Sequence, residues 1–117
     1  MISHVLAFVL MSAAPPSGLQ AKQASLVQAR QGYAGCLGTL LRSNLKEKIA
    51  PDAFNTTLGS SCKSEESNFR NASIAADVSM GTSRASAEES ATFEISDMIT
   101  NTKERYQDYV DSNTAPR

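Results

Sequence analysis

The apolar residues of this chain recur at intervals of three and four positions, which is the spacing of one face of an α-helix. A first stripe lies within residues 23–46 and consists of Leu26, Tyr33, Leu37, Leu40 and Leu41. A second stripe follows Pro51 and includes Phe54, Leu58, Phe69, Ala76 and Met80. Pro51 ends whatever helix precedes it. The pattern therefore predicts an all-α protein in which two antiparallel helices pack together as a hairpin.

The two cysteines, Cys36 and Cys62, lie at equal distances from residue 49, where the first helix should end. A chain that folds back there brings both sulfurs to the same level. Two cysteines cannot supply the four ligands of a structural zinc site, and their spacing is not that of a C-x-x-C redox motif. We therefore predict one structural disulfide that clamps the hairpin and stabilises it by roughly 3.5 kcal/mol.

The same register predicts an ion pair across the hairpin. When the cysteines are level, Tyr33 lies opposite Glu65, and Arg30 lies one turn away on the inner face. A charge on an inner face needs a partner. We therefore predict that Arg30 and Glu65 form a structural ion pair.

The second arm of the hairpin poses a choice at Gly81. Beyond this residue the apolar stripe resumes in the phase that one uninterrupted helix requires, at Ala87, Ala91, Ile95, Met98, Thr102, Tyr106 and Tyr109. A lone glycine is tolerated inside a helix. We therefore expect one long helix over residues 52–111, and the alternative is a compact three-helix bundle with a turn at Gly81.

A continuous helix would leave its distal half uncovered, because the first helix is too short to reach it. An open apolar stripe implies a partner. We therefore predict self-association, of the coiled-coil type, or a protein partner on the surface formed by Ile95, Met98, Ile99, Tyr106, Tyr109 and Val110. In the bundle alternative this stripe closes on the other helices.

An unbroken apolar run over residues 5–11 precedes Pro15 and Pro16. It matches the hydrophobic part of a signal peptide and is too short to cross a bilayer. We predict a signal peptide over residues 1–21 and a single helical domain over residues 22–117. The product should be periplasmic or secreted, without a stable membrane span, and the oxidising compartment favours the disulfide.

The net charge of −1 argues against non-specific nucleic-acid binding, which needs a basic surplus. The charge is unevenly spread, and residues 22–48 carry the basic side chains Lys22, Arg30, Arg42, Lys46 and Lys48. His4, the only histidine, lies in the predicted signal peptide. Ser-His-Asp and Cys-His catalysis are therefore not expected, and no glycine loop for phosphate is present. We predict no catalytic, cofactor-binding or metal-binding residues.

These patterns indicate an exported helical protein with a non-catalytic binding or structural role, acting through protein–protein interaction or self-association. Two alternatives stay open. The first is a carrier of a small ligand or metal, and the second is a carboxylate-dependent enzyme. No motif is specific enough to indicate a family.

Overall fold

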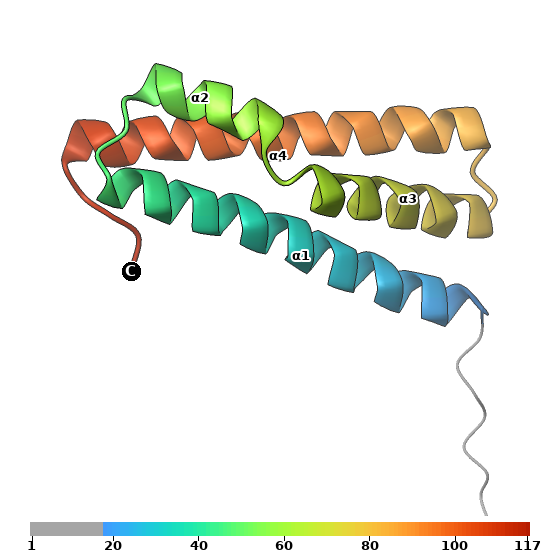
Figure 1. Cartoon of the computed structure of the whole chain (residues 1–117). Helices are drawn as coiled ribbons and strands as arrows, with labels where there is room; N and C mark the ends of the chain where they lie inside the picture. The colour runs from blue at the N-terminus through green and yellow to red at the C-terminus, as the bar shows by residue number, and fades with distance from the viewer. Residues whose placement is uncertain (1–17) are drawn as a thin grey trace, which may run out of the picture.

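The computed structural model describes residues 18–117, which form four helices and no strand: α1 (Gly18–Lys46), α2 (Pro51–Ser60), α3 (Lys63–Ser79) and α4 (Arg84–Ser112). The helices α2 and α3 follow one another as a broken rod, antiparallel to both α1 and α4 (Figure 1). The all-α prediction is confirmed. The predicted signal peptide falls mainly on residues 1–17, which lie outside the described residues, while residues 18–21 belong to α1.

The predicted disulfide between Cys36 and Cys62 is confirmed, with the two Cα atoms 6.0 Å apart. It joins the middle of α1 to Cys62, one of the two residues between α2 and α3. Within the described range neither cysteine is free, and no helix has the length and apolar character needed to cross a membrane.

The chain turns at Gly81, so the expectation of one helix over residues 52–111 is wrong and the alternative turn is confirmed. Gly81 has φ +94°, a conformation that a residue with a side chain rarely adopts. The Thr82 N–H donates to the Asp77 carbonyl and the Gly81 N–H to the Val78 carbonyl, which are the two bonds of a Schellman motif. Ser83 then caps α4.

A second break, which neither sequence alternative predicts, separates α2 from α3. Here Cys62 adopts the left-handed conformation, with φ 58°, and the Ser61 hydroxyl donates to the Thr57 carbonyl. The break changes the direction of the rod. As a result α3 packs mainly against α1, whereas α2 packs mainly against α4 (Figure 1).

The core lies between the three rods and contains two aromatic pairs, one on each side of the disulfide. Tyr33 and Phe69 are stacked with ring centroids 6.0 Å apart, and Phe54 and Tyr106 are stacked at 3.8 Å. All four rings are buried. The remaining large members of this core are Leu37, Leu41, Leu58 and Ile95.

The turn at Gly81 folds α4 back onto the other helices, and this covers the surface predicted for a partner. Ile95 and Tyr106 are 4% and 0% exposed, respectively. Met98, Ile99 and Tyr109 are partly buried against the core, and Val110 is 40% exposed. The prediction of an open distal stripe is therefore wrong, because it depended on a helix that continued through Gly81.

Replacement of Gly81 by alanine tests the turn, because a turn and a continuous helix predict opposite changes in the free energy of unfolding. Gly81→Ala should destabilise the protein by about 1–2 kcal/mol, because alanine is strained at this φ. Gly32→Ala is the matched control, since Gly32 lies within α1 and an added Cβ meets nothing within 4 Å. It should stabilise by about 0.5–1 kcal/mol. Urea unfolding measures both, and stabilisation by Gly81→Ala would contradict the turn.

Burial of Tyr33 predicts a loss of stability in alkali. Desolvation, helped by the nearby Glu66 carboxylate and opposed by Arg70, raises the pKa of Tyr33 from 10.0 to about 12. The unfolded chain therefore releases this proton first, and the free energy of unfolding falls as the pH rises from about 10 to about 12. The pKa difference corresponds to a loss on the order of 2–3 kcal/mol.

Tyr33→Phe should reduce this alkaline loss, as measured by urea unfolding of both proteins at a series of pH values. It should not abolish the loss, because burial also raises the pKa of Tyr106. Parallel curves for the parent and the variant across this pH range would show that Tyr33 does not titrate differently in the two states.

Candidate functional site

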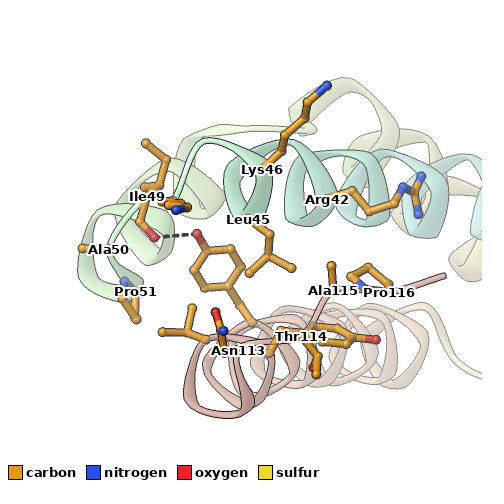
Figure 2. Close-up of a pocket in the computed structure, with 14 residues that line it drawn as sticks. Arg42, Leu45, Lys46, Ile49, Ala50, Pro51, Asn113, Thr114, Ala115 and Pro116 are labelled. Carbon is orange, nitrogen blue, oxygen red and sulfur yellow. Dashed lines mark hydrogen bonds between the residues drawn. The ribbon is translucent and has the colours of Figure 1, made fainter.

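A cavity of about 630 Å³ lies at the end of the bundle where α1 and α4 both terminate (Figure 2). Its walls come from the last turns of these two helices, the α1–α2 connection and residues 113–116. Ligand pockets in proteins usually measure roughly 300–1,000 Å³. The cavity is therefore large enough for a small organic molecule.

Local backbone structure explains why the chain opens a cavity here. Both α1 and α4 end in Schellman motifs, with Lys48 and Asn113 in the left-handed position. Each motif turns the chain sharply away from its helix axis. The residues that follow therefore form walls around the helix ends, and Pro51 starts α2 beside them.

Tyr106 fixes one wall to α4. Its hydroxyl donates a hydrogen bond of 2.6 Å to the Ile49 carbonyl (Figure 2), and its buried ring stacks on Phe54 of α2. Burial also raises the pKa of the Tyr106 phenol. Tyr106 therefore holds the α1–α2 connection through the Ile49 carbonyl, and it holds the helix that follows, α2, through Phe54.

The inner surface of the cavity is mainly apolar, and its principal apolar side chains are Leu45, Ile49, Pro51, Tyr109, Val110 and Pro116. The structure thus brings the last three residues of the predicted interaction surface, Tyr106, Tyr109 and Val110, to this cavity. It places Ile95, Met98 and Ile99 at the core instead. The sequence analysis did not predict that residues 113–116 contribute to the site.

The cavity is also basic, because Arg42, Lys46 and Lys48 line it and no acidic side chain does. In the described part of the chain, the ion pairs are Arg30–Glu94, Lys63–Glu66 and Arg84–Glu88. None of the three cavity cations belongs to them. In the sequence these cations are visible only as part of a basic segment, with no sign that three of them share a site.

The predicted Arg30–Glu65 pair is not present, and Arg30 contacts Glu94 instead. Its guanidinium lies 3.3 Å from the Glu94 carboxylate and 5.5 Å from the centre of the Phe69 ring. The prediction considered only two helices, whereas the turn at Gly81 brings α4 beside α1. Both partners are about half exposed, so the pair contributes little stability.

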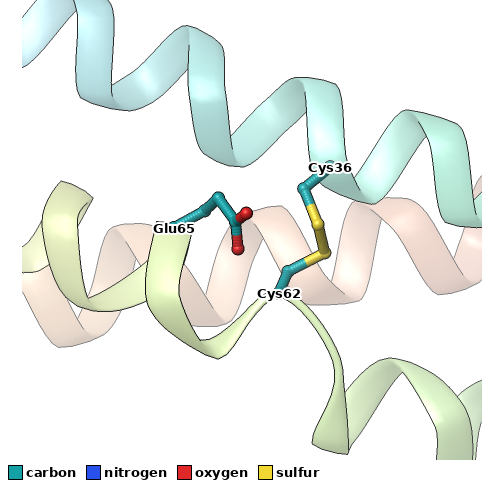
Figure 3. Close-up of side chains that lie close together, drawn as sticks. All are labelled: Cys36, Cys62 and Glu65. Carbon is teal, nitrogen blue, oxygen red and sulfur yellow. A yellow bond between two sulfur atoms is a disulfide. The ribbon is translucent and has the colours of Figure 1, made fainter.

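Glu65 lies beside the disulfide, and a ligand atom from each of Cys36, Cys62 and Glu65 falls within 4.8 Å of the other two (Figure 3). Among residues 18–117 this is the one cluster of three or more side chains of metal-ligating type. Metals bind cysteine as the thiolate. Because the two sulfurs are bonded to each other, the cluster offers no thiolate while the disulfide is intact.

The end cavity is therefore the better candidate site. Its apolar walls can hold an apolar group, its basic side chains can attract a negative charge, and Tyr106 keeps its walls in place. Comparison of the chain with known protein families, with curated proteins and with solved structures finds no match.

Proposed function

We propose that this chain is an exported, non-catalytic binding protein that holds a small molecule in the cavity at the end of its helical bundle. The observation that carries the proposal is a cavity of about 630 Å³ with apolar walls. The hydrogen bond from Tyr106 to Ile49 supports it, since a site with fixed walls binds at a lower entropic cost than one that must form on binding.

Export is supported by two independent features. The apolar run over residues 5–11 has the length of a signal-peptide core. The Cys36–Cys62 disulfide is of the kind that persists in oxidising compartments and is rare in the cytosol. We propose a periplasmic or secreted location on these grounds.

Small-molecule binding is now favoured over the protein partner that the sequence pattern suggested. The stripe on which that hypothesis rested is buried or partly buried except at Val110, and half of it lines the cavity. Self-association stays a prediction. A carboxylate-dependent reaction gains no support at the cavity, because no carboxylate side chain lines it.

A pair of matched tryptophan variants tests the proposal. Val110 lines the cavity and Val78 does not, yet their exposed fractions are 40% and 42%, and both lie in the last turns of helices. The probe is Nile red, a neutral dye that fluoresces in apolar surroundings. Val110→Trp should fill the cavity and weaken dye binding roughly ten-fold or more, whereas Val78→Trp should not.

Thermal unfolding of both variants provides the control for folding. Absence of dye binding to the parent protein, or equal binding to the parent and to Val110→Trp, would contradict a ligand site in this cavity.

A further inference from the structure

We propose that the ligand is a single-chain amphiphile with one anionic head group, held by Arg42, Lys46 and Lys48 at the cavity while its apolar body lies against the inner walls. This inference rests on the proposed function and adds the chemical class of the ligand. The head group is a carboxylate, sulfate or phosphate, because these anions all accept hydrogen bonds from guanidinium and ammonium groups.

The first support is the imbalance of charge at the cavity. Three cations line it without an acidic side chain among the lining residues and without an ion pair in the described part of the chain. Elsewhere in that part, Arg30, Lys63 and Arg84 each have a carboxylate partner and five other cations have none. The distinctive feature of the cavity is therefore that three cations line one site without an acidic side chain. Like charges that share a site repel one another, and a bound anion relieves that repulsion.

Arg42 offers the most hydrogen-bond donors to a head group. It lines the cavity together with Ala115 and Pro116, and its guanidinium lies along α1 beside Gly38 and Thr39. Its one hydrogen bond within the described residues, to the Thr39 hydroxyl, is long at 3.4 Å. The guanidinium therefore keeps most of its donors available, and it can bind a carboxylate or phosphate through two parallel hydrogen bonds.

The structural roles of these residues do not account for all three charges. Lys46 lies in the last turn of α1, where a cation interacts favourably with the helix dipole. The same effect reaches Lys48, two residues beyond the end of α1, but it decays before Arg42, which it leaves unexplained. Lys48 occupies a left-handed position, with φ 57°, where glycine or asparagine would be the usual choice. A residue with a long basic side chain therefore stands where the backbone conformation disfavours any side chain.

The start of α2 adds a smaller favourable contribution. Ala50, at its N-cap, lines the cavity and provides no side chain to accept a hydrogen bond from the first-turn N–H groups. Such N–H groups favour an anion nearby. The Asp52 side chain in the same turn opposes this effect, as do the C-terminal ends of α1 and α4, so the three cations are the main attraction.

The test is calorimetric titration of the full protein with three probes: dodecanoate below its micelle concentration, the neutral dodecan-1-ol below its solubility limit, and acetate. We expect dodecanoate to bind roughly ten-fold or more tightly than dodecan-1-ol, and acetate to bind weakly. The triple variant Arg42→Gln/Lys46→Gln/Lys48→Gln should lose that advantage while its affinity for dodecan-1-ol is unchanged.

The matched control is Lys22→Gln/Lys63→Gln/Arg84→Gln, which removes the same number of charges from residues that do not line the cavity. It should bind dodecanoate as the parent does. Equal affinities for dodecanoate and dodecan-1-ol, or an unaffected triple variant, would overturn this inference and leave the cavity as a site for neutral ligands. Failure of both amphiphiles and of Nile red would overturn the proposed function itself.

A further experiment with lipid vesicles tells whether these cations bind a free amphiphile or the surface of a membrane. Cosedimentation of the parent with anionic phospholipid vesicles, without dodecanoate binding in solution, would assign these cations to a membrane and contradict a free ligand.

Discussion

The covalent bond between Cys36 and Cys62 is the constraint on which the rest of the structure depends. It joins the middle of α1 to the α2–α3 junction and sets the level at which the rods meet. Closing a loop with a sequence separation of 26 contributes roughly 3.5 kcal/mol, against a total of about 5–15 kcal/mol for a typical domain. The large core side chains are few, so this contribution is a substantial share of the stability.

The break at Cys62 connects this constraint to the candidate site. Because the rod changes direction there, α3 stays on α1 while α2 moves onto α4, where Phe54 stacks on Tyr106. The same tyrosine then holds the α1–α2 connection through Ile49. The helix ends are left surrounding a cavity instead of closing on one another, and this cavity provides the proposed binding site.

Much of the fold could be predicted from the sequence because its signals are local. Leu37 and Leu41 lie on a helical stripe, and the symmetric placement of the cysteines indicates a hairpin. The turn at Gly81 was harder to predict. Because α3 and α4 face the same core, the helical spacing of the apolar residues continues from one helix to the other as it would in a single helix. The site could not be predicted for a different reason, since it is formed by segments that are distant in the sequence, residues 42–51 and 106–116. The contact of Tyr106 with Ile49 spans 57 residues, beyond what the register of a two-helix hairpin can indicate.

The most direct measurement of the central claim is the free energy of unfolding with the disulfide intact and after its reduction. We predict that reduction lowers this free energy by about 3 kcal/mol, and that Cys36→Ala/Cys62→Ala shows a similar loss and no further response to reductant. A loss of less than about 1 kcal/mol in both experiments would contradict the account. The packing of the helices would then hold their register without the sulfur bridge.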